Sequence, residues 1–166
     1  MATQIGGPGA AVRAHEELFA YWASLRNSGL LPGRRHLDPG GIKRLLPTVS
    51  LIDVLPQAPG AGSLEFRMRL AGTALHGVYG REITGKRLSE IYNTQATDYW
   101  RTELGKVVSE RRPAVGVHNM AWRGASHLSI LWLRLPLASD GQDVDMILGL
   151  DAVVGMSQTL SGIRAA

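Results

Sequence analysis

The chain has 166 residues, of which 45% are hydrophobic and 19% charged, and it contains no cysteine. This size and composition predict one globular domain, and the lack of cysteine excludes disulfides, thiolate catalysis and cysteine-based zinc or iron–sulfur sites. The formal charge of +4 comes from basic residues that stand in small separate groups rather than in one long run. No zinc finger or aromatic RNA-binding motif accompanies these groups, so we expect them to be solvated and expect no nucleic-acid partner.

No apolar run approaches the ~20 residues of a membrane span. The glycine-rich start of the chain lacks the basic residues and the apolar centre of a secretory signal. We therefore expect a cytoplasmic protein with no transmembrane segment.

Apolar residues at helical spacing characterise the first part of the chain. Leu18, Trp22 and Leu25 recur at this spacing, which predicts an amphipathic helix over residues 12–28. Gly29 follows directly, and a glycine just past the last turn is typical of a helix end.

A second, shorter helix is predicted before the first strand. Asp38 and Pro39 have the character of an N-cap and a first-turn proline, and Pro47 is expected to end the helix. We therefore divide this region into a flexible tail over residues 1–11 and a helical extension over residues 12–47.

Five strand-like runs and a helical middle make up the rest of the chain. The second run alternates apolar Phe66, Met68 and Leu70 with charged residues, which predicts one buried and one wet face. The fourth run is apolar on both faces, so the N-terminal helix, of the same chain or of a partner, is expected to cover the face that the middle helices leave open. The runs occupy residues 48–55, 64–71, 114–122, 126–137 and 144–152, with short helices near 73–79 and 88–92 and a longer one over 94–111.

This order of elements predicts an α+β fold. Strands that begin and end a domain can form one five-stranded antiparallel sheet with the intervening helices on one face. We place this domain at residues 48–154, with a C-terminal tail or short helix over residues 155–166. A cavity between sheet and helices would be the natural place for a small ligand.

Two stretches carry a family resemblance. The run FRMRLAGTALHGVYGREITGKRL over residues 66–88 and the run LRLPLASDG over residues 133–141 resemble short stand-alone bacterial PAS domain proteins, formerly catalogued as a domain of unknown function. The resemblance implies a sensory or regulatory module in signal transduction that binds a small molecule or a partner protein. It also implies a homodimer, which we expect to form through the N-terminal helix, and a signalling kinase or regulator as a partner.

Eight aromatic or polar residues are candidates for the wall of the cavity. Such a wall would bind a small organic acid, an aromatic metabolite or a lipid-like molecule, and the alternative is a cavity that its own side chains fill. The arginine among them could pair with a ligand carboxylate or form a salt bridge with Glu82 or Glu90. The candidates are Phe66, His76, Tyr79, Arg81, Tyr92, Trp100, His118 and Trp132.

The cofactor remains unknown, but two cofactors are disfavoured. Haem-binding relatives of this kind generally need a histidine on the longer helix, and there is none over residues 94–112. A flavin bound through a cysteine adduct is excluded by composition, whereas non-covalent flavin stays open. His118 and His127 have no third ligand at a suitable spacing, so no metal site is predicted.

Three functions remain open. The leading one is a sensory module, and the second is a ligand-free scaffold for protein interactions. The third is a small hydrolase or isomerase, which would need His76 or His118 as a buried acid or base. We expect no enzyme and name no catalytic residue.

Overall fold

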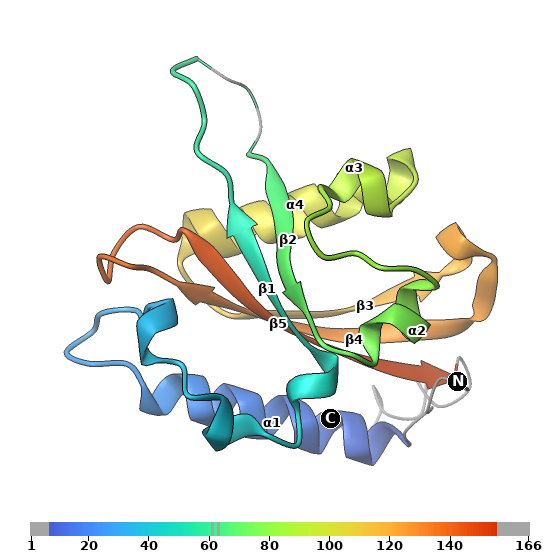
Figure 1. The fold of residues 1–166 in the computed structure, drawn as a ribbon, viewed down its shortest axis with the longest axis horizontal. Helices are drawn as coiled ribbons and strands as arrows, with labels where there is room; N and C mark the ends of the chain where they lie inside the picture. The colour runs from blue at the N-terminus through green and yellow to red at the C-terminus, as the bar shows by residue number, and fades with distance from the viewer. Residues whose placement is uncertain (1–6, 61, 63, 156–166) are drawn as a thin grey trace.

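An antiparallel sheet forms the centre of the computed structural model, which describes residues 7–60, 62 and 64–155 (Figure 1). The strands lie in the order β2-β1-β5-β4-β3, so the first and last parts of the domain meet in the middle of the sheet. This arrangement confirms the predicted fold class and each predicted strand. The strands are β1 (Val49–Val54), β2 (Phe66–Ala71), β3 (Ala114–Met120), β4 (Ala125–Leu137) and β5 (Met146–Gly155).

Three helices cover one face of the sheet, which we call the inner face (Figure 1). They are α2 (Leu75–Tyr79), α3 (Leu88–Ile91) and α4 (Thr94–Glu110). The longest of them begins at an N-cap, where the side chain of Asn93 accepts a hydrogen bond from the backbone N–H of Ala96 at 2.9 Å.

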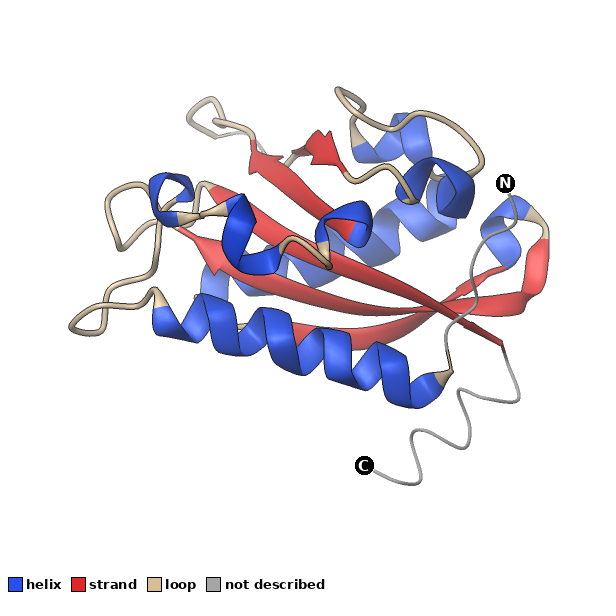
Figure 2. Cartoon of the chain, turned by 60° about the horizontal axis from the view of Figure 1, so that its bottom comes forward, coloured by secondary structure: helices blue, strands red, loops and turns tan. Residues whose placement is uncertain are grey.

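The N-terminal helix α1 (Pro8–Ser24) covers part of the opposite, outer face (Figure 2), as the two-sided apolar strand predicted. Trp22 anchors it, because its indole Nε1 donates a hydrogen bond of 2.9 Å to the carbonyl oxygen of Pro136 in β4. His15 Nε2 lies 3.1 Å from the carbonyl oxygen of Leu131 and must carry the proton in this contact, since a carbonyl only accepts.

The bounds of this helix differ from the prediction. It begins at Pro8, inside the segment expected to be a tail, because the fixed φ of a proline suits the first turn. It ends at Ser24, and Ser28 and Gly29 then adopt positive φ in a turn that pairs Asn27 with Leu30. The glycine therefore serves this turn and not the helix end.

The predicted helix after Asp38 is also different. The Asp38 side chain does accept a hydrogen bond from the backbone N–H of Gly40 at 2.9 Å, but only short 3-10 turns follow, over Pro39–Ile42 and Leu46–Thr48. Glycines in the first turn weaken an α-helix there, and Pro47 lies inside the second turn instead of ending the first. A further 3-10 turn covers Arg34–His36. The predicted C-terminal helix lies outside the described residues, apart from Gly155 at the end of β5.

A bulge in β2 overturns one prediction about the faces of this strand. Leu51 pairs with Leu70 and Ile52 pairs with Met68, so Arg69 is an extra residue in the ladder. Because side chains alternate between faces, the extra residue moves Leu70 to the face opposite Met68. Leu70 thus lies on the outer face, where it is 46% exposed, instead of in the core.

Candidate functional site

A buried ion pair lies at the centre of the inner face. Trp132 of β4 pairs with Asp151 of β5, which brings Arg134 and Asp151 to the same face, and their side chains lie 2.7 Å apart with only 2% of each exposed. Gly149 leaves room for the arginine, because a Cβ atom there would lie 3.0 Å from Arg134 Nη1. Burial opposes the charge of Arg134, but the nearby carboxylate outweighs it and raises the pKa of the guanidinium.

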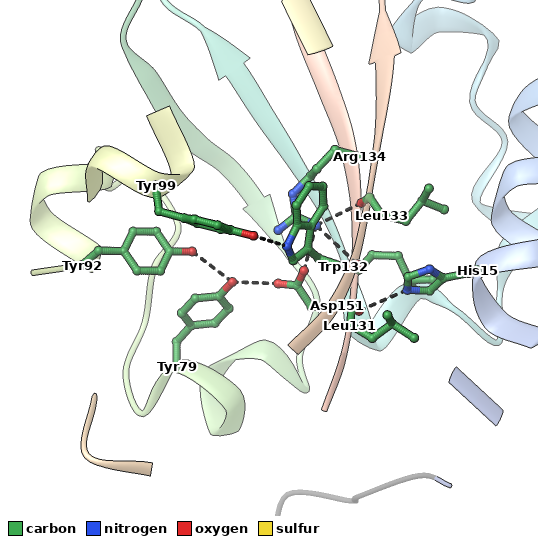
Figure 3. Close-up of polar contacts among 10 residues, drawn as sticks. His15, Tyr79, Tyr92, Tyr99, Leu131, Trp132, Leu133, Arg134 and Asp151 are labelled. Carbon is green, nitrogen blue, oxygen red and sulfur yellow. Dashed lines mark hydrogen bonds and ion pairs between the residues drawn. The ribbon is translucent and has the colours of Figure 1, made fainter. Parts of the chain in front are cut away.

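Two tyrosines extend this pair toward the helices (Figure 3). The Tyr79 hydroxyl donates a hydrogen bond of 2.7 Å to Asp151 Oδ2, and the Tyr92 hydroxyl donates one of 3.1 Å to Tyr79. Burial and the neighbouring carboxylate raise the pKa of both phenols, so both remain protonated donors at neutral pH.

Tryptophans fill the space between the sheet and α4. The Arg134 guanidinium lies 4.7 Å from the ring centre of Trp100 and 5.8 Å from that of Trp132, distances typical of cation–π contacts. Gly116 on β3 makes room for the Trp132 indole, since a Cβ atom there would come within 2.4 Å of that ring. The interior that could have held a ligand is thus occupied by side chains.

An open cleft of about 650 Å³ lies beside this interior, between the first half of α4 and the end of β3. Tyr99 connects the cleft to the buried interior. Its ring stacks on His118 with centroids 4.2 Å apart, and its hydroxyl accepts a hydrogen bond of 3.0 Å from Trp132 Nε1. The cleft is lined by Asn93, Gln95, Ala96, Asp98, Tyr99, Thr102, Glu103, His118, Asn119, Ala121 and Trp122.

Two of the residues that line this cleft carry a buried nitrogen atom without a hydrogen-bond partner among the described residues. His118 Nδ1 and Trp122 Nε1 have no hydrogen-bond partner in the part of the chain that the structure describes. Burial lowers the pKa of His118, so its imidazole is neutral at physiological pH. The only charged residues in the wall are Asp98 and Glu103, whose charge disfavours the organic acid, one of the three ligand classes considered from the sequence.

The predicted site residues separate into four groups. Tyr79, Tyr92, Trp100 and Trp132 meet around the ion pair, whereas Phe66 is buried in the core. His118 lines the cleft.

The other two predicted residues, His76 and Arg81, are exposed. Arg81 makes neither predicted salt bridge. Its guanidinium donates instead to the carbonyl oxygens of Glu90 and Ile91, the latter at 2.7 Å, because the end of α3 turns these acceptors toward it.

Sequence reasoning missed the ion pair, although a signal for it was present. Arg134 is the only charged residue of β4, and Asp151 is the only charged residue of β5. A lone charge in each of two apolar strands indicates a buried pair, since an isolated charge would be costly to bury. Tyr99 and Trp122 were missed because they adjoin the interior only through the tertiary fold.

The two partly buried histidines predict how stability depends on pH. Burial lowers the pKa of His118 and of His15, the latter in spite of its hydrogen bond to Leu131. The unfolded chain, with a histidine pKa of about 6.5, then binds more protons than the folded chain, so the free energy of unfolding falls as the pH drops below that value.

We expect His118→Phe, which keeps a ring against Tyr99, to lose less stability than the natural protein between pH 7 and pH 5. Urea unfolding at several pH values measures this difference. An identical pH dependence in both proteins would contradict it.

Comparison with known proteins identifies the family. The sequence pattern of the PAS domain matches residues 10–152, which is most of the chain. No curated protein sequence matches the chain. Among the described residues, no helix is long and apolar enough to cross a bilayer.

Solved structures are similar to this chain at low sequence identity. The PAS domain of Bordetella pertussis BvgS is 12% identical, with a TM-score of 0.51 over 90% of this chain and 96% of that one. A light-oxygen-voltage domain studied with a flavin analogue is 13% identical, with a TM-score of 0.51 over 77% and 94%. The Rhodobacter sphaeroides LOV protein is 16% identical, with a TM-score of 0.49 over 91% and 73%. The match of the family pattern over nearly the whole described fold shows that this chain belongs to the PAS domain family.

Proposed function

We propose that this protein is a sensory or regulatory module that binds a small polar molecule in the cleft beside α4. Binding of this molecule would change the packing of the side chains between the cleft and the outer face of the sheet. The observation that carries the proposal is an unbroken series of contacts from the cleft to α1. His118 stacks on Tyr99, Tyr99 accepts a hydrogen bond from Trp132, and the preceding residue of β4, Leu131, accepts one from His15 of α1.

A second series of contacts starts from the other wall of the cleft. The Trp122 ring lies 4.8 Å from Tyr92 and 5.9 Å from Tyr79, and Tyr79 donates to Asp151 on the central strand β5. A ligand acceptor that bound Trp122 Nε1 would move a ring that touches both tyrosines. Both walls of the cleft therefore contact the buried polar network around Arg134, which gives ligand binding a physical route to the middle of the sheet.

The outer face of α1 supports the output that we propose. Val12 and Phe19, two turns apart on this helix, are 40% and 45% exposed and form an apolar stripe that could bury itself in a homodimer. We propose this stripe as the dimer contact, and a cytoplasmic signalling kinase or regulator as the partner that reads it. Removing the whole helix would uncover the sheet, so a point change such as Phe19→Glu tests the contact more cleanly.

Native mass spectrometry of protein purified from its own host tests both parts. We expect a dimer with added mass that disappears on denaturation, and Phe19→Glu is expected to shift the dimer toward monomer. Thr102→Trp should fill the exposed wall of the cleft and abolish the added mass. The matched control, Ser109→Trp, changes an exposed position of the same helix outside the cleft and should retain the ligand.

The filled interior favours one alternative, a scaffold that binds a partner protein and no ligand. A dimer without added mass in the natural protein and in both tryptophan variants would overturn the ligand-binding proposal and support the scaffold. A small hydrolase or isomerase has less support, because His76 is exposed and Nδ1 of His118 has no described partner that could orient it as a base.

A further inference from the structure

A second hollow lies on the outer face of the sheet, away from the cleft and the ion pair. It has a volume of about 340 Å³ and lies between the segment of residues 34–46 and the outer side of β1, β2 and β5. Figure 1 shows this segment, in blue to cyan, between α1 and the start of β1. We call it the outer groove, and it is lined by Arg34, Arg35, Leu37, Pro39, Ile42, Leu46, Val49, Leu51, Leu70 and Leu148.

The bulge in β2 builds the floor of the outer groove. In a regular ladder, with Arg69 paired, Leu70 would lie on the inner face with Met68, whereas the bulge places it beside Leu51. Leu70 is left 46% exposed, although apolar side chains of this size are usually buried. Leu70 is the exposed member of this apolar floor, in which Val49, Leu51 and Leu148 are at most 7% exposed.

The wall of the outer groove is held in place by the backbone. Gly72 N donates to the carbonyl oxygen of Val49 at 2.8 Å, and Ala74 N donates to that of Pro47 at 2.9 Å. At the mouth, Arg35 Nη1 donates to the carbonyl oxygen of Ser139 at 2.7 Å. The groove therefore exists before any ligand arrives, which lowers the cost of binding.

The charges at the groove have one sign. Its wall contains two arginines and no acidic residue, and the Arg34 guanidinium makes no ion pair or hydrogen bond with the other described residues. Asp53, farther along β1, is already paired with Arg67 at 3.2 Å. A free guanidinium in the wall of an apolar groove is suited to a carboxylate that carries an apolar tail.

We propose that the outer groove binds a single-chain acyl carboxylate, with its chain on the aliphatic floor and its carboxylate on Arg34. The apolar part of the wall contains leucine, isoleucine, valine and proline but no aromatic residue, which suits an alkyl chain better than a flat ring system. The volume lies at the lower end of the range of roughly 300–1,000 Å³ for small-molecule sites, as expected for a chain of medium length. This site is separate from the cleft and does not depend on the function proposed for it.

Isothermal titration with sodium dodecanoate, below the concentration at which it forms micelles, tests the proposal. We expect saturable binding of one dodecanoate per chain, and binding at least about tenfold weaker for dodecyltrimethylammonium and for butyrate. The first of these probes keeps the tail and reverses the charge, and the second keeps the charge and shortens the tail.

Variants locate the site. Leu70→Asp and Arg34→Ala change exposed side chains, so both proteins should fold, and each should weaken dodecanoate binding about tenfold or more. Val115→Asp and Arg44→Ala change an exposed valine and an exposed arginine outside the groove, so both variants should bind dodecanoate as tightly as the natural protein. If Leu70→Asp unfolds the protein, Leu70→Ser serves in its place.

Three results would overturn the proposal: no saturable binding of dodecanoate, equal binding of the cationic probe, or equal binding by Leu70→Asp and the natural protein. Binding only to anionic vesicles, and not to monomeric dodecanoate, would also overturn it and indicate a membrane surface instead. Thr102→Trp, which blocks the cleft, should still bind dodecanoate, so the two sites can fail independently.

Discussion

Replacing Arg134 with methionine is expected to lower the free energy of unfolding by about 3–5 kcal/mol. Methionine fills similar space, but it leaves Asp151 as a buried carboxylate without a counter-charge. The guanidinium contacts with Trp100 and Trp132 are lost as well. Urea unfolding followed by tryptophan fluorescence and by circular dichroism measures the loss.

The double variant Arg134→Met/Asp151→Asn separates the effect of charge from the effect of packing. Asparagine removes the unpaired charge and keeps an oxygen that can accept the hydrogen bond of Tyr79. We expect the double variant to recover at least half of the stability that Arg134→Met loses. If the double variant is less stable than Arg134→Met alone, the unpaired Asp151 carboxylate is not the cause of the lower free energy of unfolding.

Gly72→Ala is expected to destabilise the protein by about 3 kcal/mol, the upper end of the range for overpacking. A Cβ atom at this position would lie 2.1 Å from the carbonyl oxygen of Leu46 and 2.4 Å from that of Pro47. Both atoms belong to the backbone, so no side chain can turn aside to make room. The segment beside β1 must move, and the outer groove should lose its shape with it.

The matched control is Gly105→Ala in the middle of α4, where a Cβ atom would meet nothing within 4 Å. Since alanine is a better helix former than glycine, this change is expected to stabilise the protein by about 0.5–1 kcal/mol. Thermal and urea unfolding of both variants measure the two effects. Equal stability of Gly72→Ala and the natural protein would contradict this prediction, because it would show that the backbone beside β1 can move away from the added Cβ atom without loss of free energy.

Much of the fold follows from local sequence patterns. Alternation of apolar residues located β2, an apolar run on both faces located β4, and helical spacing located α4, because these patterns depend on neighbours along the chain. The order of elements and the runs at residues 66–88 and 133–141 indicated the PAS family, which the match over residues 10–152 confirms.

Other features could not be predicted, because they depend on contacts between distant segments. The face of Leu70 depends on a bulge that only the pairing of β1 with β2 creates. His76 is exposed although it lies only three residues before the buried Tyr79, a spacing that places both on neighbouring positions of α2, so the packing of this short helix on the sheet decides which of them is buried. The cleft forms where α4 meets the end of β3, and no local pattern marks such a meeting.

The buried ion pair also bears on which alternative folds this chain avoids. β4 and β5 are apolar on both faces, so a slip of one residue between them would exchange one set of apolar contacts for another at little cost. In the slipped ladder, Arg134 and Asp151 would lie on opposite faces, and each charge would be buried alone. We expect the pair to contribute less to net stability than to the choice of a single strand register, and so to protect the central hairpin against misfolding.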